Sequence, residues 1–308
     1  MVSQLIARMA DRNIHDFKVD NQMEVGQTHY FKSDFGLMNW VNRIYQVREE
    51  DPTVIIRQQY FVNIPALKKA KTSSLTSNQN NNNQNKKIVW INFVRDPIEQ
   101  FISQYYYKRN GYSSIKRDAN SKSNRLYNEN NLKSIDPKTI DLSLDECIKK
   151  KFEECLFPQS EFLSYFCGNT NSCRPKFLHS KEKEENVKES DLKYALNRAK
   201  NNIKSHYFIV GHLERIEEFI QFLHNSLPRY FRGAKFFYDR MTQNSSFYAS
   251  HYDSSTGGRI KPNKGTYAFL REKLKYEIEL FEFIKEEFDR KVEGFRMRFG
   301  DGHIAQRV

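Results

Sequence analysis

The chain has 308 residues, long enough for one sizeable hydrophobic core, and no break in composition divides it, so we expect a single domain over residues 1–308. Its 50 Lys and Arg outnumber its 38 Asp and Glu, which gives a net charge of +12 and a pI of ≈ 9.3. This excess argues against a cationic partner and favours an anionic one: nucleic acid, an anionic membrane or a sulfated polysaccharide.

The amino-terminal third shows few strong structural patterns. Residues 2–10 predict an amphipathic helix that leads into an extended segment over 14–19. Neither a bilayer-spanning stretch nor the charged-then-apolar pattern of a signal peptide is found. Residues 72–87, with four consecutive asparagines at 80–83, read as a polar insertion that cannot bury a core, and a second polar insertion covers 113–138.

The most informative stretch is the apolar run at 88–94, which predicts a strand buried on both faces, as in a parallel sheet. Arg95, Asp96 and Pro97 follow and open a helix with apolar residues at helical spacing. Arg95 and Ser103 therefore lie across a strand-to-helix junction, where α/β sheets bind phosphate. A capped helix with a solvated arginine is the alternative, and spacing alone does not separate the two.

Basic side chains are densest just after Ser103. They are Lys108, Arg109, Lys116, Arg117, Lys122 and Arg125. A charge run of this kind, taken alone, favours a solvated surface loop.

The four cysteines form two close pairs, Cys147 with Cys155 and Cys167 with Cys173. Neither pair has the Cys-x₂-Cys spacing or the nearby histidine of a metal site, so short-range disulfides are favoured and we expect no metal. Paired cysteines indicate an oxidising, secretory compartment. The glycosylation sequon at Asn244 agrees with that compartment.

The carboxyl-terminal half alternates strand and helix patterns. It predicts a strand over 207–211 that ends near His212, and helices over 190–204, 214–225 and 267–292. This alternation predicts an α/β fold of three layers with a mainly parallel central sheet. A P-loop of the order Gly-Lys-Ser/Thr is not found.

The Val94-Arg-Asp-Pro97 segment and its Ser103-Gln-Tyr-Tyr-Tyr107 helix resemble the 3′-phosphate-binding segment of the heparan sulfate and uronyl 2-O-sulfotransferases. Further motifs follow in that family's order, namely Asp145-Glu-Cys147, Tyr165-Phe-Cys-Gly168, Phe208-Ile-Val-Gly211 and Leu227-Pro-Arg-Tyr-Phe-Arg-Gly233. The resemblance covers residues 1 to about 296. It implies sulfuryl transfer from 3′-phosphoadenosine 5′-phosphosulfate (PAPS) to the 2-hydroxyl of uronic acids in a glycosaminoglycan, in the Golgi lumen and without a nucleic-acid partner.

By the same resemblance, Arg95 and Ser103 would bind the 3′-phosphate of the nucleotide. Tyr238 would complete the nucleotide site, with an aromatic core residue as its alternative reading. Thr256 and Arg259 would complete it too, because Thr-x-x-Arg-x-x-Pro here matches a Thr-x-x-Lys-x-x-Pro pattern in the family. A flexible surface loop is the alternative for these two residues.

The resemblance also places Lys108, Arg109 and Arg117 beside the sugar cleft, and it implies the same two disulfides. Family members are often trimeric, so a homo-oligomer is possible here, although the chain's last residues do not resemble the tail that joins those trimers.

Two departures bear on activity. The relatives keep a histidine base in a pattern like Arg-His-Val-His-Phe-Leu-Asn, whereas residues 57–63 here read Arg-Gln-Gln-Tyr-Phe-Val-Asn, with Gln58 at the base position. A glutamine amide can orient a hydroxyl but cannot take its proton. The family's first strand, its lysine-bearing phosphosulfate loop and a membrane anchor are expected upstream of Met1, so this chain would hold the sulfotransferase fold without that strand and loop.

Two other readings therefore remain open. One is a catalytically impaired relative that binds sulfated polysaccharide. The other is a basic nucleic-acid-binding protein, which predicts four free thiols in place of disulfides.

Overall fold

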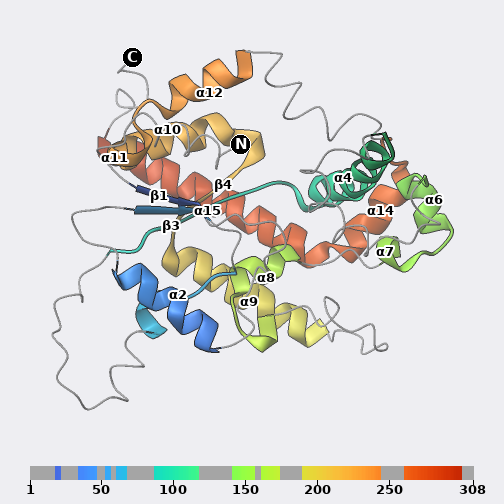
Figure 1. Cartoon of the computed structure of the whole chain (residues 1–308), viewed down its shortest axis with the longest axis horizontal. Coiled ribbons are helices and arrows are strands. Elements are labelled where there is room, and N and C mark those ends of the chain that lie inside the picture. The colour runs from blue at the N-terminus through green and yellow to red at the C-terminus, as the bar shows by residue number, and fades with distance from the viewer. Residues whose placement is uncertain are drawn as a thin grey trace.

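The computed structural model describes residues 18–21, 34–46, 53–56, 60–67, 87–117, 141–156, 161–173, 189–243 and 260–299. The strands are β1 (Lys18–Asn21), β2 (Thr53–Ile56), β3 (Trp90–Val94) and β4 (Tyr207–His212). The helices are α2 (Asp34–Gln46), α4 (Pro97–Arg117), α6 (Leu144–Lys149), α7 (Glu153–Leu156), α8 (Glu161–Cys167), α9 (Glu189–His206), α10 (Ile216–Ser226), α11 (Pro228–Phe231), α12 (Ala234–Gln243), α14 (Lys264–Lys273) and α15 (Lys275–Phe299), with 3₁₀ turns at Asn171–Cys173 and Leu213–Arg215 (Figure 1).

Several predicted features lie outside these described residues: the helix at 2–10 and most of both polar insertions. The helix α4, however, continues to Arg117, into the stretch predicted as an insertion from residue 113. None of the described helices is both long enough and apolar enough to cross a membrane.

The described strands form two parallel pairs, whereas the sequence predicted one mainly parallel central sheet. β1 lies beside β2, and β3 lies beside β4 with Trp90 opposite Tyr207 and Val94 opposite His212. β3 is shorter than the apolar run that predicted it, with five residues, and of these only Val94 is fully buried. The predicted strand is therefore present, but four of its five residues are only partly buried.

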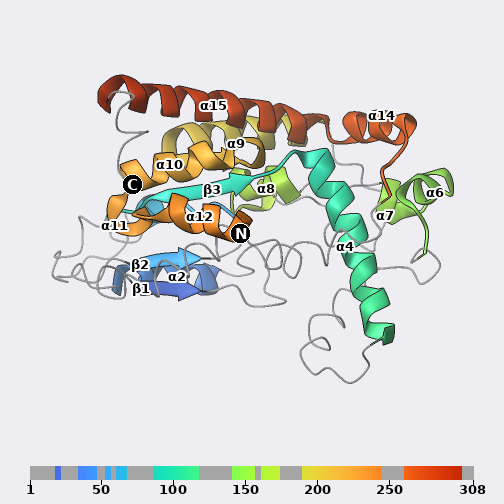
Figure 2. The ribbon, with the colours of Figure 1, turned by 90° about the horizontal axis from the view of Figure 1, so that it is seen from above.

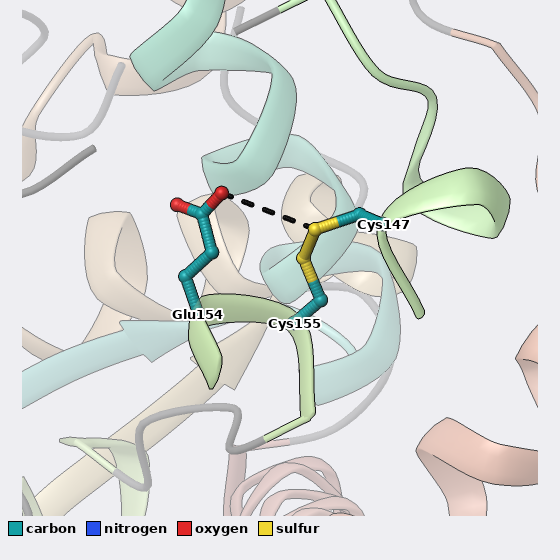
Figure 3. A group of neighbouring side chains, drawn as sticks. All are labelled: Cys147, Glu154 and Cys155. Atoms are coloured by element: carbon teal, nitrogen blue, oxygen red, sulfur yellow. Dashed lines mark hydrogen bonds between the residues drawn. A yellow bond between two sulfur atoms is a disulfide. The ribbon is translucent and has the colours of Figure 1, made fainter. Parts of the chain in front are cut away.

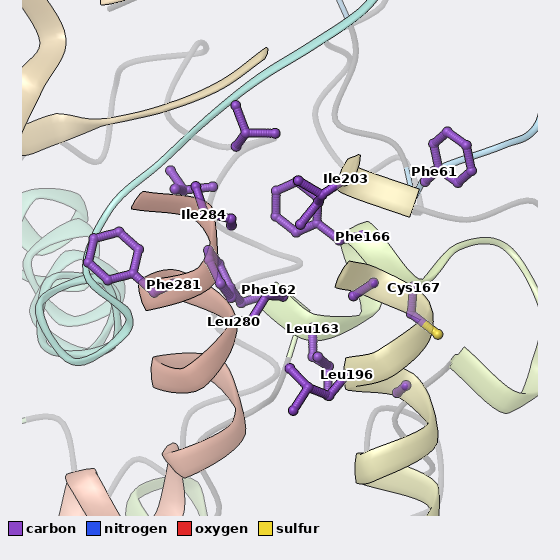
Figure 4. Close-up of a cluster of buried hydrophobic side chains, with 14 of the residues drawn as sticks. Phe61, Phe162, Leu163, Phe166, Cys167, Leu196, Ile203, Leu280, Phe281 and Ile284 are labelled. Carbon is purple, nitrogen blue, oxygen red and sulfur yellow. The ribbon is translucent and has the colours of Figure 1, made fainter. Parts of the chain in front are cut away.

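Helices cover both faces of the β3–β4 pair, and neighbouring residues of β4 point to opposite faces. Val210 packs with α8, α9 and α15 in the cluster of Figure 4, whereas Ile209 packs with α10, α11 and α12. In Figure 1 α10 and α12 lie on one side of the strands and α8 and α9 on the other. Gly211 is required at its position, because a Cβ there would lie 2.3 Å from the ring of Phe219.

The carboxyl-terminal helix predicted over 267–292 is two helices, since α14 ends before Leu274 and α15 begins after it. The first turn of α15 buries Glu277, whose side chain is only 3% exposed. Its Oε1 has no hydrogen-bond partner among the described residues. Burial raises the pKa of Glu277 to about 7.

This buried carboxyl makes stability depend on pH. The folded-state pKa lies above the ordinary value of 4.5, so Glu277 adds no penalty below about pH 4.5, destabilises the fold increasingly between about pH 4.5 and 7, and adds a constant penalty at higher pH. We expect Glu277→Gln to raise the free energy of unfolding at pH 8 by up to about 3 kcal/mol and to change it little at pH 5. Urea denaturation at both values checks this, with exposed Glu286→Gln as the control. Equal effects of the two substitutions at pH 8 would contradict it.

Candidate functional site

The strand-to-helix junction after β3 is built as predicted. Arg95 follows the last residue of β3, and the Asp96 side chain accepts a hydrogen bond of 2.9 Å from the backbone N–H of Glu99. This bond caps α4, whose first residue is Pro97. The junction therefore presents an arginine beside the positive end of a 21-residue helix. Figure 2 shows the chain passing from β3 into this helix, α4.

The Arg95 side chain is paired but remains accessible. Its Nη2 lies 3.6 Å from Oε2 of Glu99, and the two side chains are 35% and 36% exposed. The other oxygen of Glu99 accepts a 3.3 Å hydrogen bond from the hydroxyl of Tyr267 on α14. Since guanidinium carries five N–H donors, this arrangement leaves Arg95 able to bind an anion from solvent.

Ser103 lies on α4, half-buried, about 9 Å further along the helix axis than Pro97 at 1.5 Å per residue. The structure thus places Arg95 and Ser103 on consecutive elements. Their convergence on one phosphate stays a prediction.

The start of α14 is held next to this junction. Asn263 caps α14 by accepting a 2.9 Å hydrogen bond from the backbone of Thr266. Its own backbone N–H donates to both carboxylate oxygens of Asp145 on α6, at 3.2 and 3.1 Å. Both ribbon views place α14 beside α4 and α6 (Figures 1 and 2). Thr256 and Arg259 precede this segment in sequence and, like Gln58 and Asn244, lie outside the described residues.

Tyr238, the other predicted nucleotide residue, lies on α12. It is 9% exposed and belongs to the apolar cluster of Ile209 and Phe219. This placement matches the alternative reading of an aromatic core residue, and a nucleotide contact stays untested.

Arg109 lies in the interior of the protein, contrary to the role predicted for it. Its side chain is 5% exposed and forms an ion pair with Glu154 of α7. It also donates a 3.1 Å hydrogen bond to the backbone carbonyl of Tyr105, and its guanidinium carbon lies 3.4 Å from the centre of the Tyr105 ring. Burial strongly raises the pKa of Tyr105 although the Arg109 cation opposes this, which indicates a poorly hydrated site. A side chain engaged in this way joins α4 to α7, so it cannot also reach a sugar. Lys108 and Arg117 lie on α4, but their side chains are outside the described part.

Both predicted disulfides are present, Cys147–Cys155 between α6 and α7 and Cys167–Cys173 after α8. The first lies beside Glu154, whose Oε1 is 3.9 Å from the sulfur of Cys147 (Figure 3). Although two sulfurs and a carboxylate gather here, the sulfurs share a bond and offer no thiolate, and Glu154 is engaged by Arg109. The group serves to hold α7 against α4.

Two described histidines lie at opposite ends of the β3–β4 pair. His212 is the last residue of β4 and is 3% exposed. Its Nε2 atom is buried, and its Nδ1 atom lies 2.8 Å from Oε2 of Glu214. His206 precedes Tyr207, which pairs with Trp90 at the other end of β3. At about 3.3 Å per residue, a five-residue strand separates that end from Arg95 by roughly 16 Å.

Sequence reasoning missed Glu99 and Tyr267. The spacing of four residues between Arg95 and Glu99 is a helical ion-pair spacing and could have revealed that contact. No local signal connects Glu99 to Tyr267, because 168 positions separate them.

Comparison with known proteins identifies relatives along most of this chain. It is 32% identical to Heparan sulfate 2-O-sulfotransferase 1 of Mus musculus over 227 residues, which cover 71% of this chain and 52% of the relative. The Xenopus laevis protein of that name is 33% identical over 226 residues with the same coverages. Uronyl 2-sulfotransferase of Homo sapiens is 27% identical over 205 residues, which cover 65% of this chain and 43% of the relative. No family model matches the chain.

The chain therefore belongs to the family of heparan sulfate and uronyl 2-O-sulfotransferases, as its motifs predicted. It spans about half the length of the curated relatives that it matches.

The interior position of Arg109 leads to a stability prediction. We expect Arg109→Ala to lower the free energy of unfolding by about 2–4 kcal/mol, because it leaves Glu154, 23% exposed, without its cation. Exposed Arg271→Ala on α14 should change stability by less than about 0.5 kcal/mol. Urea denaturation of both variants is the measurement. If Arg109→Ala were as stable as Arg271→Ala, the ion pair would have no structural role.

Proposed function

We propose that this chain binds PAPS and a glycosaminoglycan, and that its reaction is sulfuryl transfer to the 2-hydroxyl of uronic acid residues in heparan or dermatan/chondroitin sulfate. The proposal is carried by the position of Arg95 in a chain of this family. Its side chain is about one-third exposed, follows the end of a parallel strand and lies beside the capped start of α4. The proposal includes a single P-loop-like sulfotransferase domain and a Golgi address.

The donor half of the reaction is assigned to residues that fit an anion. Arg95 offers a planar fork of N–H donors, and it lies beside the positive end of the α4 helix dipole. Ser103 supplies a hydroxyl to the same phosphate, and Tyr238, Thr256 and Arg259 complete the nucleotide site. PAPS itself supplies the sulfuryl group and carries away the electron pair of the broken sulfur–oxygen bond as 3′,5′-ADP.

The acceptor half is assigned to the positive charge of the chain. A net charge of +12 attracts a sulfated polysaccharide, and Lys108 and Arg117 on α4 are the proposed contacts. Arg109 is left out of this set because Glu154 and Tyr105 engage it.

Removing the proton from the acceptor hydroxyl is the weak point of this site. As the acceptor oxygen bonds to sulfur, its proton must pass to a base, and the amide of Gln58 can only orient the hydroxyl. This residue favours a second candidate function, in which the chain binds sulfated polysaccharide and nucleotide but turns over slowly.

The donor assignment is tested at Arg95. We expect Arg95→Ala to weaken binding of 3′,5′-ADP by about 1.5–3 kcal/mol, the cost of a lost hydrogen bond to a charged group, and to leave 5′-AMP binding unchanged because that ligand lacks the 3′-phosphate. Isothermal calorimetry measures both affinities, with Arg271→Ala as the control. Unchanged affinity of Arg95→Ala for 3′,5′-ADP would refute the donor site.

The catalytic assignment is tested at Gln58. We expect Gln58→His, made in a form of the protein that carries the phosphosulfate loop, to raise kcat for sulfate transfer by up to the 10²–10⁴-fold that is typical of general acid–base catalysis. The assay uses labelled PAPS with desulfated heparan sulfate and with dermatan as acceptors. Gln59→His, one position along, is the matched control and should not increase turnover. Fast transfer by the unmodified chain, with no gain on Gln58→His, would mean that another residue is the base.

A further inference from the structure

We infer that Glu99 is a positioning residue for the donor site, which holds the guanidinium of Arg95 with one carboxylate oxygen and the hydroxyl of Tyr267 with the other. This inference rests on the proposed function, because it concerns how Arg95 is aimed at the 3′-phosphate. It assigns a role to one residue of α4 and one of α14.

The carboxylate of Glu99 is restrained from two directions. Its backbone N–H donates to the Asp96 side chain at 2.9 Å, which fixes the position of the residue in the first turn of α4. Its Oε1 accepts the 3.3 Å hydrogen bond from Tyr267. The remaining oxygen then faces Arg95 at 3.6 Å in a restricted orientation.

The contact to Tyr267 distinguishes Glu99 from an ordinary surface ion pair. Exposed pairs four residues apart on a helix typically contribute little to stability and restrain neither side chain strongly. Tyr267 is half-buried, comes from a different helix and anchors the carboxylate from outside α4. If the arginine side chain is already ordered before the ligand binds, less conformational entropy is lost on binding.

Two effects of Glu99 on a phosphate ligand oppose each other. Its negative charge repels the phosphate, whereas its contact with Arg95 orients the guanidinium fork. Removing the charge would tighten binding if repulsion dominated and weaken it if orientation dominated. We infer that orientation dominates, because both side chains are about one-third exposed and solvent screens the repulsion.

The same network fixes α14. Tyr267 lies one turn after Asn263, whose backbone is held by Asp145 on α6. Arg95 is thus connected through Glu99 to a helix with a second, independent attachment. This explains why a residue of α14 would affect a ligand bound at the end of β3.

The test is a double-mutant cycle measured by calorimetry with 3′,5′-ADP and 5′-AMP. We expect Glu99→Gln to weaken 3′,5′-ADP binding about threefold to tenfold and Tyr267→Phe to weaken it about twofold to threefold, with 5′-AMP affinity unchanged in both. In an Arg95→Ala background, neither substitution should have any further effect. Exposed Glu272→Gln on α14 is the control and should bind both ligands as the unmodified chain does.

The outcomes separate this inference from the proposed function. If Arg95→Ala weakens 3′,5′-ADP binding but Glu99→Gln leaves it equal or tighter, the positioning role is overturned and the donor site stands. Equal losses for 3′,5′-ADP and 5′-AMP, or effects that add to that of Arg95→Ala, would assign Glu99 a general structural role instead. If Arg95→Ala has no effect, the donor site itself fails. Because Tyr267→Phe removes only a hydroxyl, it keeps the test open if Glu99→Gln folds poorly.

Discussion

The parallel pairing of β3 with β4 is the constraint on which the rest of the described structure depends. It joins two segments more than a hundred positions apart, so the chain between them must cross over, and α4, α6, α7, α8 and α9 all belong to that crossover. Because parallel strands share direction, Val94 and His212 end at the same edge. Arg95 emerges there, beside the start of the next helix.

Acidic side chains make several of the links between the elements around this edge. Glu99 connects α4 to α14, Asp145 connects α6 to the start of α14, and Glu154 connects α7 to α4. These links also explain why Arg95 and Arg109, on the same segment, differ in their exposure to solvent. Arg109 is desolvated and engaged by Glu154, whereas Arg95 shares a more distant carboxylate and stays accessible to an anion.

The donor and acceptor sides of the proposed reaction differ in how well the chain supports them. The junction proposed for the phosphate has an accessible arginine beside the start of a long helix. The resemblance puts Gln58 at the position of the base. Of the described histidines near the sheet, His212 is enclosed and His206 lies at the far end of β3.

Local patterns in the sequence determined the junction at Arg95, the helix α9, the strand β4 and both cysteine pairs, because each depends on residues close together along the chain. Tertiary structure alone decided the burial of Arg109, the placement of Tyr238 in a core, the division between α14 and α15, and the contact of Glu99 with Tyr267. These features depend on partners distant in sequence. A charged residue in a polar stretch looks the same in sequence whether solvent or a buried carboxylate awaits it, and only packing determines which it meets.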